Sequence, residues 1–509
     1  MFADIAISGW RQIEISAIVK RHETIKIVDM NHFIKGIMLG SMLSLAAGAA
    51  LAEITGYGPR LKPEDRVSQD QVAGGSLNLV EIRRAGLKVF TTPFNRADGH
   101  GDGAHDTSVA DNRDPASGNR PGLQGSRTFL RVNGLDSQTC LECHSVVSTA
   151  SIPAQFGVGG VGTINNNALF QPSVIDVADE DFDGIAGFDG RVINPPFLFG
   201  SGGVELLARE MTADLQALRE QALDSPGLPV ALLTKGVSFG EITADGFGGF
   251  DTSGLEGIDA DLVVRPFGRK GDKASVREFA VAALSFHLGM QAAEAFGGEY
   301  ADQDNDGVQN EISVGDLSAM SIFLTTMERP HQKKPGKDDR HGSALFNSIG
   351  CADCHRPVLT TSSKHLHFKL TGAPQYPFED TFYSVDLTRA PMKFQAAAGA
   401  GVKVELFSDL KRHDMGEGLS ESFSKATDEQ NRQFITARLW GIADTAPYMH
   451  DGRALTLVEA IQSHDSPGSE AAPAAQAFGA LDEADKNNLI RFLMTLRTPG
   501  KPHADVLKR

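Results

Sequence analysis

A Cys-x-x-Cys-His unit occurs in the stretch Gly350-Cys351-Ala352-Asp353-Cys354-His355. The same unit occurs once more, in Cys140-Leu141-Glu142-Cys143-His144. Two cysteines at this spacing can each form a thioether to one vinyl group of a haem, and the adjacent histidine can then bind the iron. We therefore expect two covalent c-type haems. Their expected anchors are Cys140, Cys143 and His144 for haem 1, and Cys351, Cys354 and His355 for haem 2.

Two other kinds of site also use pairs of cysteines. A zinc ribbon keeps its two halves about 15 to 20 residues apart, whereas the two units here stand far apart in the chain. A thioredoxin-like redox pair predicts a βαβ context and needs no histidine, yet histidine follows both units and their flanks are loop-like. The two units use all 4 cysteines of the chain, so both alternatives are less favoured than haem attachment.

Composition limits the class of protein. The chain has 509 residues, of which 41% are hydrophobic and 22% are charged. These values are typical of a soluble globular protein with two or three domains. The net charge of −17 argues against nucleic acid as a partner and favours solubility or a basic redox protein as partner, although a merely solvated surface is the commoner meaning of such a charge.

Residues 30–52 have the pattern of a secretory signal peptide. A short basic start is followed by an apolar run, which ends in the small-x-small site Ala50-Leu51-Ala52. The run is short for a membrane-spanning helix and contains three glycines, so a membrane anchor is the less favoured alternative. We expect residues 1–29 to be a non-translated or non-structural leader. The mature protein is expected to begin at Glu53, to be exported and to have no stable membrane span.

Apolar residues at helical spacing predict several helices, separated by long loops rich in Gly, Asp and Asn. The Pro/Lys-rich segment 329–340 indicates a boundary between two domains. The expected fold is therefore mainly α with long irregular loops, in two c-type cytochrome domains over 53–330 and 331–509, each holding one haem. An amphipathic segment is expected over 71–90, and helices are expected over 203–218, 276–295, 317–327, 456–463 and 482–496.

Two loops, 179–184 and 302–307, share the spacing Asp-x-Asp-x-Asp-Gly. Carboxylates at alternate positions of a turning loop can gather hard oxygen ligands for calcium. Neither loop is a complete EF-hand loop, because its twelfth position is Gly190 or Ser313 rather than glutamate. A simple Asp/Gly turn is the alternative for both. The better candidate for calcium is the second loop, with Asp302, Asp304 and Asp306.

The run Ala446–Arg453, followed by Leu457–Ile461, resembles the C-terminal signature of the bacterial di-haem cytochrome c peroxidase superfamily. Over roughly residues 75 to 500 the chain is most similar to the di-haem oxidoreductase branch, often labelled thiol-oxidoreductase-like. The stretches that carry this second resemblance are 264–271, 287–291, 302–311 and 408–416.

The resemblance implies a division of labour between the haems. In that superfamily one haem transfers electrons and the other reacts with peroxide or oxygen, and a residue shortly after the Met-His-Asp-Gly run is an axial ligand of the C-terminal haem. The first candidate after His450 is His464, so the resemblance implies His355 and His464 as the axial ligands of haem 2. Family members that need reductive activation carry a distal histidine soon after the first haem unit. This chain has no histidine between His144 and His287, which implies an open iron at haem 1.

Our leading hypothesis is a periplasmic, peroxidase-like oxidoreductase that uses peroxide or oxygen and exchanges electrons with a small redox protein. Cleaving a peroxide O–O bond requires moving a proton between its oxygens, so a carboxylate or a similar group is expected over the open face of haem 1. Glu205 is the first candidate and Glu210 the second. Exposed or helix-capping glutamates are the alternative for both.

Two further hypotheses stay open. One is a haem-dependent oxygenase of the same superfamily. The other is a di-haem electron carrier without substrate chemistry, which requires a sixth ligand on haem 1. The available residues for that ligand are His287, Met290, Met211 and Met415, although a histidine such as His287 on an apolar helix is usually a core residue. Trp440 could assist electron passage near haem 2, but packing is its commoner role.

Overall fold

The computed structural model describes residues 58–101, 137–144, 146, 169–175, 188–298, 300–302, 306–370, 381–421 and 427–500. Over 169–175 and 188–193 only the backbone is described. The chain divides into two compact units, Met1–Gly58 and Pro59–Arg509, and every element named below lies in the second. The expected leader, the signal peptide and the first Asp/Gly loop lie outside the described residues. In the part of the chain that is described, no helix combines the length and the apolar character needed to cross a membrane.

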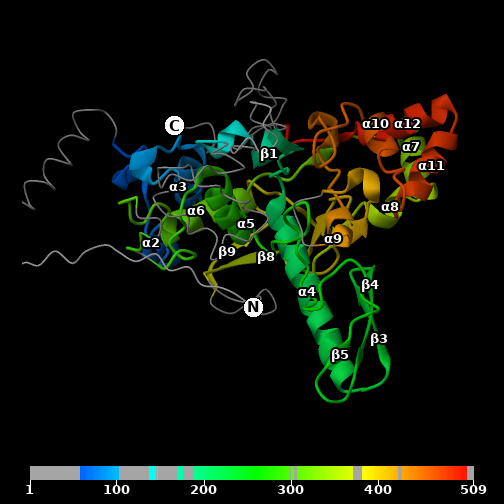
Figure 1. Ribbon diagram of the computed structural model, residues 1–509, viewed down its shortest axis with the longest axis horizontal. Coiled ribbons are helices and arrows are strands. Elements are labelled where there is room, and N and C mark those ends of the chain that lie inside the picture. Colours follow the sequence, from blue (N-terminus) through cyan, green and yellow to red (C-terminus); the bar gives the residue numbers. More distant parts are fainter. Residues whose placement is uncertain are drawn as a thin grey trace, which may run out of the picture. The chain divides into compact units, whose positions relative to one another are not determined.

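Helices form in each of the segments where apolar periodicity predicts them (Figure 1). The expected segment 71–90 includes the end of α2 and nearly all of α3. Each of the other five segments overlaps one α-helix. Their bounds are α2 Gln69–Ala73, α3 Leu79–Thr91, α4 Ser201–Leu223, α5 Val276–Ala283, α6 Val314–Thr325, α10 Leu457–Gln462 and α12 Glu483–Leu493.

Several helices begin at a polar side chain that accepts a hydrogen bond from the first turn, as N-cap residues do. Ser275 caps α5, Ser313 caps α6 and Asp482 caps α12. Thr456 and Glu459 form a reciprocal capping box at the start of α10. These local signals fix where the helices around both haem units begin.

The helix expected over 276–295 ends early. After α5 the chain makes a π-helical turn, η5 (Leu284–Leu288), and then Gly289 takes a left-handed φ of 67°. A Cβ added at Gly289 would lie 2.7 Å from the carbonyl carbon of Gly101. The close approach to residue 101 therefore requires glycine, and this contact ends the helix.

The expectation of a mainly α fold needs correction, because the described residues also form six small antiparallel sheets. The longest strand has eight residues. Strands as short as two residues carry no alternating pattern, which is why apolar periodicity did not reveal them. The sheets are β1 Leu169–Ile175 with β2 Phe188–Ile193; β3 Pro229–Thr234, β4 Val237–Ala244 and β5 Phe250–Asp251; β6 His331–Gln332 with β14 Leu496–Arg497; β7 Leu359–Thr360, β11 Val402–Val404 and β10 Gln395–Ala396; β8 His365–Lys369 with β9 Thr381–Asp386; and β12 Arg412–Asp414 with β13 Gln433–Ile435.

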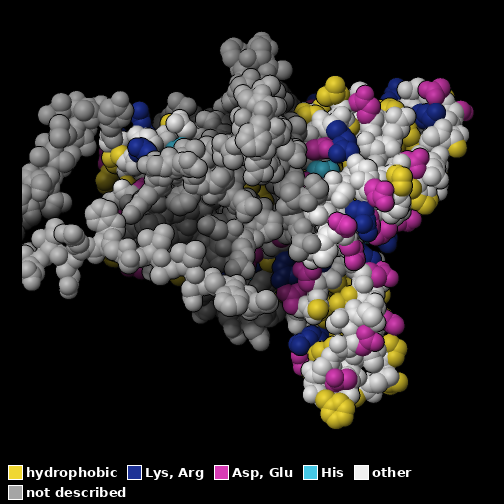
Figure 2. Space-filling view, viewed as in Figure 1, with side chains coloured by type: hydrophobic (Ala, Val, Ile, Leu, Met, Phe, Trp, Pro, Cys, Tyr) yellow, Lys and Arg dark blue, Asp and Glu magenta, His cyan; other side chains and the backbone are white. Residues whose placement is uncertain are grey.

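The remaining elements are short helices around the two haem units and in the loops. They are η1 Pro63–Asp65, η2 Arg96–Asp98, η3 Cys140–Glu142, α7 Lys337–Ser348, α8 Cys351–Cys354, η6 Glu417–Leu419, α9 Asp428–Arg432, η7 Ile442–Asp444 and α11 Ala472–Ala480. Acidic and basic side chains are interspersed over the region of α4 and the C-terminal helices (Figure 2).

Two hydrophobic cores organise the unit Pro59–Arg509. The larger core is built by α3, α4, α6 and the strands β3, β4, β8, β9 and β11, and it extends in sequence from Leu61 to Trp440. The smaller core surrounds α7 and α12 and extends from Phe346 to Leu496. The larger core takes residues from both sides of position 330, and the two-domain division at that position stays a prediction.

Helices α7 and α12 cross at Gly342. A Cβ on Gly342 would lie 1.9 Å from the carbonyl oxygen of Asn488, so only glycine allows the two backbones to approach this closely. The crossing places the second haem unit, directly after α7, against the smaller core.

Candidate haem sites

The second haem unit forms one helical turn. Gly350 has a left-handed φ of 95° and starts α8, and the amide of His355 donates to the carbonyl oxygen of Cys351 at 2.9 Å. Residues three apart on a helix share a face, so both thiols, which are free and half-buried, lie on one side. Burial raises the pKa of Cys351 to about 11, which keeps its thiol protonated. This arrangement fits two thioether bonds to one haem.

His355 is held in one orientation by the backbone. Its Nδ1 lies 3.1 Å from the carbonyl oxygen of Phe407. A carbonyl can only accept, so Nδ1 carries the hydrogen and Nε2 keeps its lone pair for a metal. Burial, and next the neighbouring His464, lower the pKa of His355 to about 4, so its imidazole is neutral at physiological pH. Phe407 has a left-handed φ of 55°, a strained conformation that directs this carbonyl toward His355.

His464 has the same kind of anchor. It follows α10, and its Nδ1 lies 2.8 Å from the carbonyl oxygen of Ala460. Burial lowers the pKa of His464, so it too is neutral with Nε2 free. The ring centroids of His355 and His464 are 6.4 Å apart. Two imidazoles that bind one metal through bonds of about 2 Å place their nitrogens about 4 Å and their centroids about 6 Å apart. The pair therefore fits the two axial ligands of one iron.

Aromatic rings enclose the His355 side of this site. Phe346 lies 6.4 Å from the His355 ring, and Phe346, Phe407 and Phe492 contact one another at centroid distances between 5.4 and 6.1 Å. All three phenylalanines belong to the smaller core. The proximal face of the site is thus dry and rigid, which favours a flat apolar ligand over water.

The first haem unit is a 3-10 turn, η3. Thr139 receives the amide of Leu141 at 3.4 Å, and its hydroxyl donates to the carbonyl oxygen of Phe90 at 3.2 Å. The ring of Phe90 lies 6.4 Å from that of His144. Burial, and next His287, lower the pKa of His144 to about 3. In contrast to His355, the Nδ1 of His144 is buried and has no hydrogen-bond partner among the described residues.

His287 is the residue that the structure brings to the first unit. It lies in the π turn η5, a distortion that is frequent at functional sites, and it is close enough for its charge to lower the pKa of His144. The next residue, Leu288, accepts the amide of Gly101 at 3.0 Å, and the neighbouring His100 contacts the carbonyl oxygen of Ser137 at 3.0 Å.

The other residues named for the sixth ligand of haem 1 are three methionines, and Cys140 and Leu141 of the first unit pack against the same larger core as two of them. Met211 and Met290 are fully buried in the larger core. Met415 forms a bridge with Ser469. Of these candidates, His287 is the one whose charge influences the pKa of His144 within the described part of the chain.

Glu205 and Glu210 each have bonding partners that explain their positions. Buried Glu205 accepts the amide of Val276 at the start of α5 at 2.9 Å and pairs with Arg209. Glu210 pairs with Lys235 at 2.8 Å and accepts the amides of Ser362 and Ser363 at 2.6 and 2.9 Å. Neither glutamate is exposed; Glu205 caps the start of α5, which fits the helix-capping alternative, and Glu210 holds a loop. Their catalytic roles stay predictions.

A pocket of about 240 Å³ adjoins Glu210 and is lined by Leu206, Arg209, Glu210, Ala213, Asp214, Lys235, Ser362, Ser363 and His367. Because Glu210 already pairs with Lys235 there, the pocket offers no free carboxylate from Glu210.

The second Asp/Gly loop makes its own internal hydrogen bonds. Asp302 accepts the amides of Asp306 and Gly307, each at 3.1 Å, and Asp306 accepts the amide of Val308 at 2.7 Å. Such bonds form Asx turns without a metal. Asp304 lies outside the described residues, and calcium binding stays a prediction.

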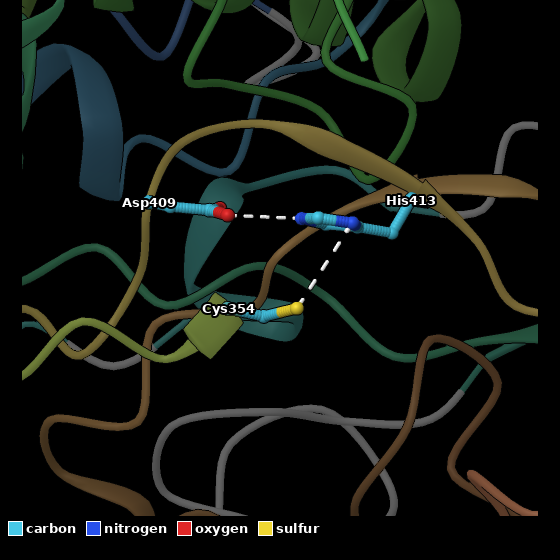
Figure 3. Close-up of side chains that lie close together, drawn as sticks. All are labelled: Cys354, Asp409 and His413. Carbon is cyan, nitrogen blue, oxygen red and sulfur yellow. Dashed lines mark hydrogen bonds and ion pairs between the residues drawn. The ribbon is translucent and has the colours of Figure 1, made fainter. Parts of the chain in front are cut away.

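A cluster around His413 was not expected from the sequence. Asp409, His413 and Cys354 lie together (Figure 3). The Nε2 of His413 lies 2.9 Å from Asp409, its Nδ1 lies 2.7 Å from Glu470, and the Sγ of Cys354 is 4.0 Å from Nδ1. Burial would lower the pKa of His413, but hydrogen bonds to Asp409, Cys354 and Glu470 outweigh it and raise the pKa to about 11. His413 is therefore a permanent cation between two carboxylates, beside the second haem unit.

One signal could have revealed half of this cluster. Asp409 and His413 stand four residues apart in the stretch 408–416, which also carries the family resemblance, and this short spacing allows an ion pair between them. Glu470 is 57 residues further on, and nothing in the local sequence links it to His413.

Comparisons with known proteins identify a family for the part of the chain that contains His413 and His464. Residues 381–496 match the family described as "Di-haem oxidoreductase, putative peroxidase". A curated relative, the cytochrome-c peroxidase IdrP2 of Pseudomonas sp. (strain SCT), is 30% identical over 175 residues, which are 33% of this chain and 43% of that protein. The chain thus spans less than half the length of this relative.

Two solved structures show weaker similarity. One is a MauG-like protein associated with microbial copper homeostasis, at 18% identity and a TM-score of 0.26, covering 46% of this chain and 69% of that chain. The other is the hydrazine synthase of Kuenenia stuttgartiensis, at 15% identity and a TM-score of 0.30, covering 82% and 93%. Structural overlap this low does not support an argument about the fold.

Proposed function

We propose that this chain is an exported di-haem c-type oxidoreductase with peroxidase-like activity. The match of residues 381–496 to the di-haem oxidoreductase family supports this proposal and agrees with the predicted resemblance. In this proposal, haem 1 is the reaction centre and haem 2 the electron-transfer centre. Peroxide is the first candidate substrate and oxygen the second. The redox partner is a small redox protein, basic on its contact face because the chain carries a net charge of −17.

The observation that carries the proposal is the histidine pair of the second site. His355 and His464 are both neutral, both donate Nδ1–H to backbone carbonyls, and their rings are 6.4 Å apart. Two rigid axial ligands leave no free position on an iron, and this suits electron transfer rather than substrate binding. The carbonyl anchors at Phe407 and Ala460 would hold both imidazoles in a fixed orientation toward a bound haem.

The residues of the first unit support the other role. When bound, a haem supplies an iron that can exchange electrons and accept a small oxygen ligand. His144 is neutral and can serve as a ligand on one face. Cleaving peroxide also requires a group that moves a proton from one oxygen to the other. His287, whose charge influences the pKa of His144, is our candidate for this group, because Glu205 and Glu210 already hold a helix start and a loop.

One observation favours a second candidate function. The proximity of His287 to His144 would also allow His287 to occupy the sixth position of haem 1. With both irons closed, the chain would be a di-haem electron carrier. The two candidates differ in whether haem 1 can bind an external ligand.

Carbon monoxide binding to the ferrous protein and peroxide-dependent oxidation of a reduced small cytochrome distinguish the two candidates. We expect one haem of the wild type to bind carbon monoxide and peroxide to oxidise the donor. His287→Ala should slow peroxide turnover and leave carbon monoxide binding intact. A matched control is His341→Gln, whose histidine is 52% exposed in an ion pair with Asp485. Failure of the wild type to bind carbon monoxide or to use peroxide, with both properties appearing in His287→Ala, would favour the carrier.

A further inference from the structure

Residues 438–440 pass between the two hydrophobic cores. The amide of Leu439 donates to the carbonyl oxygen of Leu406 at 3.1 Å, next to Phe407, whose carbonyl orients His355. Leu439 packs against the smaller core. Trp440 belongs to the larger core, where its ring lies 6.5 Å from that of Phe394. Leu439 therefore faces the smaller core, whereas Trp440 faces the larger core.

Trp440 has a buried donor without an acceptor. The residue is 5% exposed, and its Nε1 has no hydrogen-bond partner among the described residues. A buried indole N–H normally finds a partner, because leaving it unpaired forfeits its hydrogen bond to water. The ring cannot turn freely, since it also packs against Gly200, where an added Cβ would lie 2.8 Å from it. The N–H is thus held in place with nothing to donate to.

Arg438 has a buried guanidinium that pairs with no carboxylate of the described residues. Its guanidinium donates to the carbonyl oxygens of Pro266 at 3.1 Å and Phe197 at 3.4 Å, and lies 5.9 Å from the ring of Phe267. Throughout the described ranges no carboxylate forms an ion pair with it, and burial lowers its pKa to about 10. A guanidinium has five N–H donors, and two carbonyls do not neutralise its charge. Buried charges are normally paired.

We propose that Arg438 and Trp440 together bind a carboxylate, namely a propionate of the haem held by His355 and His464. The inference rests on the proposed function, because it requires haem 2 at that position. A propionate supplies what both side chains lack: a negative charge for the guanidinium and an acceptor for the indole N–H, in charge-assisted hydrogen bonds. The backbone bond from Leu439 to Leu406 places the segment that carries both donors next to Phe407, whose carbonyl orients His355.

The test uses the full haem-loaded protein and the variants Arg438→Met and Trp440→Phe. Arg491→Met is the matched control, because Arg491 is 60% exposed and pairs with Asp339 at 3.5 Å on the surface of α12. The readouts are the reduction potential of the low-spin haem between about pH 5 and pH 8, where an unperturbed carboxylate is ionised, and the propionate bending band in resonance Raman spectra.

In the wild type we expect a potential that is independent of pH, because the paired propionate stays ionised. Arg438→Met should lower the potential above the propionate pKa and make it depend on pH, since the carboxylate has lost its cation and binds a proton more readily. Trp440→Phe should shift the Raman band with a smaller change in potential. Arg491→Met should match the wild type.

Variants that lower the melting temperature but keep the wild-type potential and Raman band would overturn the inference and leave only a packing role. A response of the wild-type band or potential to added acetate would also overturn it, because the site would then take free carboxylates. The two proposals fail separately: absence of a low-spin haem in the wild type contradicts ligation by His355 and His464, whereas an unchanged Raman band in both variants contradicts carboxylate binding.

Discussion

Replacing His413 by glutamine should destabilise the protein, because the buried carboxylate of Asp409 then loses its cationic partner. Asp409 is 4% exposed and His413 is 11% exposed, so in the variant Asp409 is a buried carboxylate without a cation. Removing one partner of a buried ion pair costs about 3 to 5 kcal/mol. Glutamine can still donate to Asp409, and exposed Glu470 can be solvated, so we expect the low end, about 3 kcal/mol.

The pH dependence of stability follows from the raised pKa of His413. Below pH 6.5 both the folded and the unfolded chain are protonated at this residue, and its full contribution is present. Between pH 6.5 and the raised pKa of His413 in the folded protein, the folded protein keeps the proton that the unfolded chain releases, so the free energy of unfolding falls as the pH rises. The slope for one proton is about 1.4 kcal/mol per pH unit at most. His413→Gln should lack this component.

Urea unfolding of the haem-loaded protein, followed by the Soret band and by Trp440 fluorescence, measures both effects. His341→Gln is the control, because its exposed pair with Asp485 should contribute less than about 1 kcal/mol. The double variant Asp409→Asn/His413→Gln should recover part of the lost stability, since it removes the unpaired charge. The free energy of unfolding of His413→Gln could instead lie within about 0.5 kcal/mol of the wild-type value, the range of ordinary surface substitutions. That result would show that His413 does not form a buried ion pair with Asp409 in solution.

Three other predictions concern different parts of the chain. Gly342→Ala should destabilise the protein by about 2 kcal/mol or more, because its Cβ would lie 1.9 Å from the carbonyl oxygen of Asn488; thermal unfolding, with Gly479→Ala as an unobstructed control, measures it. Chelation should lower the melting temperature if the second Asp/Gly loop holds calcium, and Asp304→Ala with unchanged metal content and melting would show a simple turn. N-terminal sequencing of the exported protein should begin at Glu53, and an intact segment 1–29 would contradict the expected leader.

The parts of the site that could be predicted from sequence are those encoded locally. The spacing within each Cys-x-x-Cys-His unit is itself the geometry of attachment, and the structure shows the second unit as a single helical turn. Helices with strong apolar periodicity and polar caps were also predictable, because both signals lie within one segment. His464 became a candidate only through family resemblance, and its carbonyl anchor at Ala460 follows from its position at the end of a short helix.

The rest depends on contacts between distant segments. The carbonyl of Phe407 that orients His355, and the pairing of His413 with Glu470, join residues that are 52 and 57 positions apart. The early end of the helix after α5 is due to backbone contact with residue 101. The partners of Glu205 and Glu210 include amides from other elements, and a pattern within one helix cannot show them.

Electron paramagnetic resonance of the resting ferric protein tests the division of labour between the haems most directly. The account predicts one low-spin signal from an iron held by His355 and His464, and one high-spin or water-bound signal from an iron held by His144 alone. His464→Gly should convert the low-spin signal while both covalent haems are retained, and His144→Gly should leave the low-spin signal intact. Two low-spin haems that resist external ligands in the wild type would contradict the account and identify the chain as an electron carrier.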